Sequence, residues 1–297
     1  MVFFMDAKEK VYARYGGRDS NDADNRQSLE GLRYTMKSVA AMHGRQKKQF
    51  APKVEGAPVY IREISAGGGK CLHCHQVRER LDRKLIADGD WSRNLVYRYP
   101  LPENLGFRLE VKRGNVVEKI TPGSPAEKAG LKKGDVVKRL GNVPIHSFGD
   151  ATYALDKALA AGALNVSWMR DKQVMTASIE LPNGWRKTDI SWRRSLRRLI
   201  PSAPFNGDDL AAAERKQLGL TQTQLAFRQN DRLPTRAKDA GFRSGDIIIG
   251  VDDRKLDLSV TDFFFYVRRE YLVGDTIHLA VLRDGKKLTI PLLLTSR

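Results

Sequence analysis

The sequence predicts an α+β protein of several domains, in which one structural unit occurs twice. Residues 124–135 and 235–246 share one pattern, with two alanines, a glycine and a closing Gly-Asp pair. Each segment leads into a β-branched run, which is typical of a buried strand. Apolar residues at helical spacing follow each run, so strands and helices alternate within both copies.

The first 50 residues predict two strands and a helix. Residues 2–4 and 11–15 form two short strand-like runs, and Gly16-Gly17 closes the second. Ser28 is placed to cap a helix. The apolar residues of that helix recur at spacings of three and four: Leu32, Met36, Val39 and Met42. We therefore expect a ββα domain over residues 1–50.

Residues 51–100 predict a linker that ends in a helical segment. The prolines at 52 and 58 and the glycines at 67–69 are typical of a linker. A Cys-x-x-Cys-His motif then opens a helix with a short apolar stripe: Val77, Leu81 and Leu85. Residues 88–90 end it.

The two copies are expected over residues 101–183 and 211–297, with a linker at 184–210 between them. Gly130 and Gly241 suit the left-handed position that ends a short helix. A longer helix follows in each copy, with the stripes Phe148, Ala151, Leu155, Leu159 and Val260, Phe263, Phe264, Val267, Tyr271. A hairpin closes each copy. Its turn is the favoured Asp-Gly in the second copy and the poorer Asp-Lys in the first.

The pattern Ser-Pro-Ala-x-x-Ala-Gly-Φ-x-x-Gly-Asp before a strand resembles bacterial PDZ domains, such as those attached to HtrA-type proteases. The resemblance covers residues 103–182 and 216–295 and implies two partly open β-barrels with helices. In that family, backbone N–H groups of a loop hold the C-terminal carboxylate of a peptide or protein partner. The peptide then adds as a strand, here between residues 107–111 and 148–161. The binding residues implied are Leu105, Gly106, Phe107, Arg108 and Leu109.

The second copy matches this loop less well. Leu218-Gly219-Leu220 is the nearest match, but Thr-Gln-Thr-Gln separates it from the strand expected at residues 225–229. We expect a groove that is altered or closed.

The first 50 residues resemble the second half of a thioredoxin fold, which would make the chain an N-terminally truncated member of a family. That family combines thioredoxin-like, CxxCH and tandem PDZ segments in exported bacterial proteins, some of them selenoproteins. Its catalytic Cys-x-x-Cys (or selenocysteine) site and cis-proline would precede residue 1. The resemblance implies a start codon assigned inside a longer reading frame.

The motif Cys71-Leu72-His73-Cys74-His75 matches c-type haem attachment. Two thiols one helical turn apart reach the two vinyl groups of haem, and the next histidine reaches the iron. The motif thus predicts covalent haem c on Cys71 and Cys74, with His75 as the metal ligand. The sixth iron ligand is not assigned: the candidates are Met36, Met42, Met169 and His43, and a five-coordinate iron is the alternative.

Three alternatives for this motif stay open. The cysteines could form a redox dithiol with a lowered pKa at a helix start. They could bind zinc with the histidines, although no second cluster supplies the remaining ligands. The motif could also have no function in a chain that is never exported.

The linker between the copies is rich in arginine and tryptophan. If residues 185–200 form a helix, Trp192, Leu196 and Leu199 share one face and four arginines the other. Such a helix could lie on an anionic membrane surface, or pack between the two copies with solvated arginines. We expect no specific nucleic-acid partner.

The charge of the chain and the signals in its sequence limit the partners, locations and enzyme classes that we expect. Lys and Arg outnumber Asp and Glu by 52 to 35, giving a formal net charge of +17 that favours anionic partners. No export signal is visible, so a periplasmic or otherwise exported location depends on the truncated start; the alternative is cytoplasmic. No residues match the serine-protease signature of the HtrA family.

These observations favour an exported adaptor that binds peptides through its PDZ units and carries haem or a redox dithiol. No complete catalytic site is visible, so it is open whether the chain is an enzyme. One alternative is a thiol oxidoreductase whose catalytic half is missing, with the PDZ units recruiting its substrates. The other is a scaffold without redox chemistry.

Overall fold

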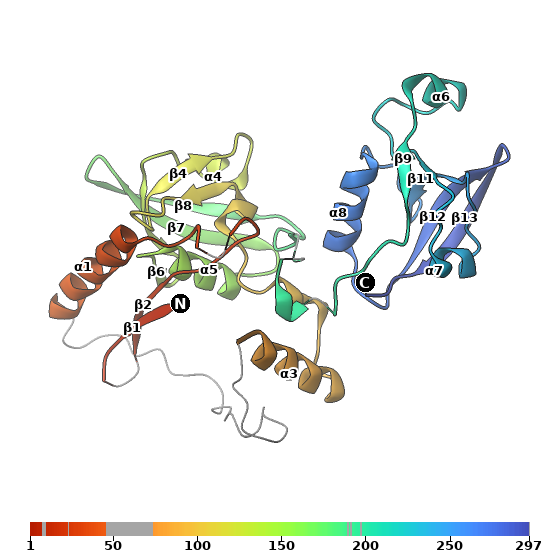
Figure 1. The fold of residues 1–297 in the computed structure, drawn as a ribbon. Helices are drawn as coiled ribbons and strands as arrows, with labels where there is room; N and C mark the ends of the chain where they lie inside the picture. The colour runs from red at the N-terminus through yellow and green to blue at the C-terminus, as the bar shows by residue number, and fades with distance from the viewer. Residues whose placement is uncertain are drawn as a thin grey trace. The chain divides into compact units, whose positions relative to one another are not determined.

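The computed structural model forms two compact units, each with one copy of the repeat (Figure 1). The first unit holds the described residues of 1–72 and 80–188, and the second holds those of 73–79 and 189–297. The structure describes residues 1–7, 10–22, 24–45, 74–188, 190, 192–196 and 198–296. No helix within these ranges is long and apolar enough to cross a bilayer.

The first copy packs a two-stranded ladder and a four-stranded sheet around one core. β3 (Phe107–Leu109) pairs antiparallel with β4 (Val117–Ile120). The larger sheet has the order β6-β5-β7-β8, with the bounds β5 (Val136–Leu140), β6 (Val143–Pro144), β7 (Gly162–Arg170) and β8 (Gln173–Leu181). The helices are α4 (Pro125–Lys128) and α5 (Phe148–Lys157). The core runs from Leu105 to Trp185 and is centred on Phe107, Val137, Leu155 and Trp168.

The second copy forms one antiparallel sheet with the order β13-β12-β11-β10-β9. Its strands are β9 (Gly207–Asp209), β10 (Phe227–Gln229), β11 (Ile247–Val251), β12 (Thr276–Arg283) and β13 (Lys286–Leu293). Its helices are α6 (Ala212–Gln217), α7 (Thr235–Asp239) and α8 (Val260–Glu270). Aromatic rings dominate the core, where Phe205, Phe227, Phe242 and Phe263 pack together.

The closing hairpins of the two copies adopt the same turn despite their different residues. Asp284 and Gly285 have φ angles of 49° and 73°. Asp171 and Lys172 have φ angles of 49° and 65°. The first copy therefore places a lysine in the left-handed region, which costs about 1–2 kcal/mol relative to glycine.

A buried arginine–aspartate pair recurs at the same place in both copies. Arg170, at the end of β7, donates to both carboxylate oxygens of Asp135 at 2.7 Å and to the carbonyl of Gly130 at 2.7 Å. Arg283, at the end of β12, makes the same three bonds to Asp246 and Gly241 at 2.7–2.8 Å. Both aspartates are only 1% exposed. The repeated Gly-Asp and Arg-Asp residues are thus explained by one interaction.

The N-terminal segment has the predicted order of two strands and a helix. β1 (Val2–Met5) and β2 (Val11–Tyr15) form an antiparallel hairpin. α1 (Leu29–Arg45) begins one residue after Ser28, whose hydroxyl accepts from the Gly31 N–H at 3.0 Å. The likeness to half of a thioredoxin fold stays a hypothesis. β2 lies beside α5 of the first copy, and α1 contacts β2 and, through Thr35, the carbonyl of His146 just before α5 (Figure 1).

The helix expected after the cysteine motif is present as α3 (Cys74–Ala87). A 3-10 turn, η1 (Arg93–Tyr97), follows and leads toward the first copy.

The amphipathic helix expected over residues 185–200 is wrong. The described residues there contain only the short 3-10 helix η3 (Arg194–Leu196), flanked by turns. Hydrogen bonds link residues three apart, from the N–H of Arg193, Leu196 and Leu199, so the turn is too tight for an α-helical face. The side chains of Trp185 and Leu196 are buried, and the Trp185 ring donates to Leu159 at 3.0 Å. These apolar groups are therefore not free to enter a membrane.

We predict that Arg283→Leu destabilises the second copy by about 3 kcal/mol, because it leaves the buried charge of Asp246 without its partner. The control is Arg228→Leu, which removes an exposed pair with Glu214 and should cost less than about 1 kcal/mol. Both can be measured as the urea dependence of hydrogen exchange in β11 and β12. Equal shifts in the two variants would contradict the role given to the buried pair.

Candidate functional site

The loop expected to bind a carboxylate lies at the head of β3. A 3-10 turn, η2 (Pro102–Leu105), ends at Gly106, which has a φ of 87°. A Cβ at position 106 would lie 2.1 Å from the Cβ of Ser124. Ser124 caps α4 by accepting from the Glu127 N–H. Position 106 therefore requires glycine for two reasons: its φ is positive, and a Cβ would collide with Ser124 of the repeat motif.

Hydrogen bonds hold this loop on both sides. The Gly106 N–H donates to Glu103 at 3.0 Å, and the Gly106 carbonyl accepts from Thr121 at 2.8 Å. One of the N–H groups expected to receive a carboxylate is thus already used within the turn. Binding of a carboxylate at this loop would have to use the remaining N–H groups.

The five predicted binding residues differ in where their side chains lie. The side chains of Leu105, Phe107 and Leu109 are buried in the core. Arg108 points the other way, is half-buried and forms a 2.9 Å ion pair with Glu118 of β4. A peptide along β3 would therefore meet backbone rather than these three apolar side chains. Among the described residues, β3 pairs only with β4, so its outer edge has no strand partner.

Helix α5 forms the expected second wall. Ser147 caps it by accepting from the Asp150 N–H at 3.2 Å. Ala151, Ala154 and Leu155 face the core. Phe148 and Thr152 do not belong to that core, yet each is only 6% exposed. A helix wall of an open groove would be exposed at these positions, so something covers them.

The cover comes from the N-terminal hairpin. The Arg14 N–H donates to Asp150 at 2.8 Å, and the hydroxyl of Ser147 donates to the Arg14 carbonyl. The Arg14 guanidinium lies 3.6 Å from the centre of the Tyr153 ring. A Cβ at Gly149 would lie 2.5 Å from the Arg14 carbonyl oxygen, so the backbone approach depends on glycine at this helical position.

Arg26 joins the loop to the helix. Its guanidinium pairs with Asp19 at 2.7 Å and with Glu103 of η2, and it lies 4.7 Å from the Phe148 ring. Both Arg26 and Asp19 are buried. Gly17 also packs against the Phe148 ring, where a Cβ would lie 2.6 Å from a ring carbon. The segment therefore spans from the carboxylate loop to α5. Sequence reasoning missed it, because these contacts join residues more than 70 positions apart.

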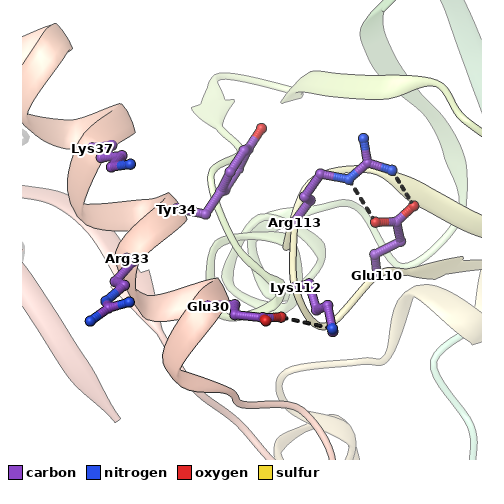
Figure 2. A pocket seen from close by; sticks show the side chains of 7 residues that line it. All are labelled: Glu30, Arg33, Tyr34, Lys37, Glu110, Lys112 and Arg113. Atoms are coloured by element: carbon purple, nitrogen blue, oxygen red, sulfur yellow. Dashed lines mark hydrogen bonds and ion pairs between the residues drawn. The ribbon is translucent and has the colours of Figure 1, made fainter.

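A charged pocket of about 660 Å³ lies between α1 and the chain that follows β3 (Figure 2). It is lined by Glu30, Arg33, Tyr34, Lys37, Glu110, Lys112 and Arg113. Lys112 pairs with Glu30 at 2.9 Å, and Arg113 forms two bonds to Glu110 at 2.8 and 2.7 Å. Arg33 and Lys37 have no ion-pair partner in the described ranges. The residues that line the pocket thus carry more positive than negative charge, which favours an anionic ligand over an apolar peptide side chain.

Asp150 is the titratable group at the centre of the contact between hairpin and helix. Burial raises the pKa of its carboxyl to about 7, against the opposing effects of the Arg14 and His146 N–H groups and the Arg14 guanidinium. Burial also lowers the pKa of His146. The contact therefore favours neutral forms of both groups.

The second copy departs from the expected arrangement. β10, the strand predicted to hold a peptide, pairs with β9 on one side and β11 on the other, so neither edge is open. Leu218-Gly219-Leu220 lies after α6 in the connection between β9 and β10. The strand that corresponds to β3 is β9, which starts 18 residues before the strand expected at residues 225–229.

Strand register identifies the corresponding loop. The Val117 and Gln229 N–H groups donate to Asp135 and Asp246, so these two strand positions are equivalent. Their partners, Leu109 and Gly207, are then equivalent as well. Counting back two residues places Phe205 at the position of Phe107, and both are buried in the cores. Pro204 thus stands where the first copy has Gly106.

Proline at this position removes the features of the carboxylate loop. It has no N–H to donate, and its ring fixes φ near −65°, far from the 87° of Gly106. The expected alteration of the second groove is therefore located at Pro204 rather than at Leu218–Leu220.

Most of the cysteine motif lies outside the described residues. Cys71 is among the residues not described, and α3 begins at Cys74. The side chains of Cys74 and His75 are also outside the described part. Elsewhere in the described ranges, no group of three His, Cys, Asp or Glu residues could hold a metal ion.

Comparison with known proteins identifies the repeated unit. The PDZ domain family model matches residues 104–181 and 232–294. The chain carries tandem PDZ domains. They resemble those of HtrA/DegP-type proteins, and we refer to the first and second copies as PDZ 1 and PDZ 2.

The similar curated proteins are longer than this chain. The periplasmic serine endoprotease DegP of Escherichia coli (strain K12) is 28% identical over 148 residues, which is 50% of this chain and 28% of that protein. A probable periplasmic serine protease do/HhoA-like of Haemophilus influenzae is 26% identical over 151 residues, 51% and 30% of the two chains. The solved structure of the HtrA-type protease AlgW with tripeptide covers 67% of this chain and 69% of that chain at 16% identity and a TM-score of 0.34.

We predict that Asp150→Asn changes how the stability of the first unit depends on pH. The folded pKa of about 7 exceeds the ordinary 3.8, so the native state holds a proton that the unfolded state has lost between these values. The wild type should therefore lose up to about 4 kcal/mol relative to the variant as pH rises from 4 to 7, with no further change above that.

Urea unfolding followed by tryptophan fluorescence can measure this, since three of the four tryptophans lie in the first unit. Parallel pH profiles of the two proteins would contradict the assignment to Asp150.

Proposed function

We propose that this chain is an exported adaptor whose PDZ 1 binds the C-terminal ends of peptides or proteins. The observation that carries the proposal is the loop from η2 to Gly106 at the head of β3. Its backbone is fixed by Ser124 and Thr121, and the adjacent strand edge has no strand partner among the described residues. Such a loop and edge suit a carboxylate followed by an added strand.

The same arrangement assigns binding to backbone at Leu105–Leu109 rather than to the apolar side chains, which are buried. Arg108 is the exception, because its half-buried side chain can contact a peptide if it leaves Glu118. PDZ 2 lacks an equivalent of Gly106, so it does not share this mode of recognition.

The periplasm is the proposed site of action. The similar curated proteins are named as periplasmic. The net charge of +17 is compatible with an anionic partner there, but the described residues of 185–200 form no amphipathic helix that would support membrane binding. The alternative location remains the cytoplasm.

For the cysteine motif we propose covalent haem c on Cys71 and Cys74, with His75 as the iron ligand. The spacing of the motif supports this, and so does helix α3 (Cys74–Ala87), whose backbone includes Cys74 and His75. Bound haem would supply one-electron chemistry. A redox dithiol formed by the same two cysteines is the second candidate, and it would suit a thiol oxidoreductase with PDZ domains that recruit its substrates. A scaffold without redox chemistry is the third.

We predict that binding at PDZ 1 depends on the peptide carboxylate. Ten-residue peptides selected on the full chain should bind at least about tenfold more weakly when their C-terminus is amidated, because a charge-assisted contact to loop N–H groups is lost. Fluorescence anisotropy gives the affinities, and hydrogen exchange should place the protected amides at residues 105–109. Equal affinity of acid and amide forms would contradict the proposed loop.

We predict that the chain, exported in a host that matures c-type cytochromes, shows a Soret band that survives denaturation. Cys71→Ser with Cys74→Ser should abolish it, whereas His73→Ala should not, because His73 has no proposed contact with haem. Absence of the band together with two thiols that form a reversible disulfide would favour the dithiol. Absence of both would leave the scaffold.

A further inference from the structure

The described residues of 11–35, here called the N-terminal cover, contact every part that surrounds the PDZ 1 groove. Arg26 contacts the carboxylate loop at Glu103. Gly31 packs against the carbonyl of Val111, just after β3. Arg14 contacts α5 at Asp150, and β2 runs beside this helix (Figure 1). The cover thus contacts the loop, the segment that follows β3 and the helix, which together surround the place where a peptide would add.

Comparison of the two copies shows that the cover, and not the PDZ fold, buries the helix wall. Ser147 and Ser259 cap α5 and α8 in the same way, each accepting from the aspartate N–H three residues on. Asp150 is buried in PDZ 1, whereas Asp262 is exposed in PDZ 2.

The helix positions assigned to the groove wall are also less exposed in PDZ 1 than in PDZ 2. Phe148 and Thr152 are buried, while their counterparts Val260 and Phe264 are half-buried, and the next residue, Phe265, is 47% exposed. The equivalent helix of PDZ 2 is therefore more exposed at these positions, although Val260 and Phe264 also pack against its core.

Charged and polar groups make much of the contact between the cover and PDZ 1, beside the packing of Gly17 on the Phe148 ring. The apolar core of PDZ 1 begins at Leu105 and includes none of the described residues 1–45. Three buried atoms at the Arg26 junction have no hydrogen-bond partner among the described residues: Asn25 Oδ1, Arg26 Nη1 and Glu103 Oε2. A contact built from ion pairs and incompletely paired polar groups separates more readily than an apolar core.

We propose that the N-terminal cover is an autoinhibitory segment, which occupies the peptide groove of PDZ 1 and leaves before a peptide adds along β3. The inference rests on the proposed peptide binding by PDZ 1. It adds that peptides bind only the molecules in which the cover has left the groove. The apparent affinity is therefore the intrinsic affinity multiplied by the fraction of undocked molecules. When no peptide is bound, the groove is occupied by the N-terminal cover of the same chain.

Gly149→Leu is the variant designed to release the cover. The added side chain would begin 2.5 Å from the Arg14 carbonyl oxygen, which the cover cannot accommodate while docked. Position 149 is helical, and leucine favours a helix more than glycine does, so PDZ 1 itself should keep its fold. Thr261→Leu is the matched control, because it occupies the same position of α8 and is exposed.

Arg26→Gln gives an independent route to the same state. It weakens the pairs with Asp19 and Glu103 without changing a residue of PDZ 1. A result seen with both variants cannot come from a leucine side chain that alters the groove.

The experiment measures docking and binding separately in the full chain. Hydrogen exchange of residues 11–15 and of the first turn of α5 reports docking without any peptide. Fluorescence anisotropy then uses ten-residue peptides with free C-terminal carboxylates. We expect faster exchange and an affinity raised at least about tenfold in Gly149→Leu and Arg26→Gln, with neither change in Thr261→Leu.

The outcomes separate the two proposals. Peptides that bind the wild type at residues 105–109 as tightly as the released variants would overturn the autoinhibition and leave peptide binding intact. Faster exchange without peptide binding in any protein would overturn both. Unchanged exchange in both variants would show that the cover is not held by these contacts and would overturn the autoinhibition.

Discussion

The buried arginine–aspartate pair holds each PDZ domain together, because it ties three separated segments at one point. In PDZ 1, Arg170 joins the end of β7 to the turn before β5 through Asp135, and to the end of α4 through the Gly130 carbonyl. Asp135 also accepts from the Lys132 N–H at 2.7 Å, which closes that turn. A nearly inaccessible carboxylate needs such partners, since its charge would otherwise be costly to bury.

The position of the carboxylate loop depends on this pair through α4. That helix is short, and its two ends meet different parts of the domain. Gly130, just past its C-terminal end, accepts from Arg170, while Ser124 at its N-terminal end packs against Gly106. A change at the arginine would therefore move the wall that fixes the loop. PDZ 2 keeps the first contact, between Arg283 and Gly241, and lacks the second, because proline replaces the glycine.

The sequence predicted what depends on local patterns and missed what depends on distant contacts. The repeat, its short helices and its strands follow from glycine and β-branched residues a few positions apart, and all are present. The cover depends on Arg14 and Arg26, whose partners Asp150 and Glu103 lie 136 and 77 residues away, so the sequence shows no periodic signal of these contacts. In PDZ 2, Leu218-Gly219-Leu220 resembles the binding loop in sequence, but it follows α6. The strand that pairs with β10 is β9, which precedes α6, so the position equivalent to Gly106 is Pro204.

The inequality of the two PDZ domains follows from backbone chemistry at one position rather than from a different fold. Both keep the arginine–aspartate pair, the serine cap on the long helix and the same hairpin turn. Substituting surface side chains could not give PDZ 2 the loop of PDZ 1, because proline can neither donate an N–H nor adopt the positive φ of Gly106. The covered groove is thus the one whose loop retains the glycine. The loop on which peptide binding is proposed and the cover proposed to control it therefore occur in the same domain.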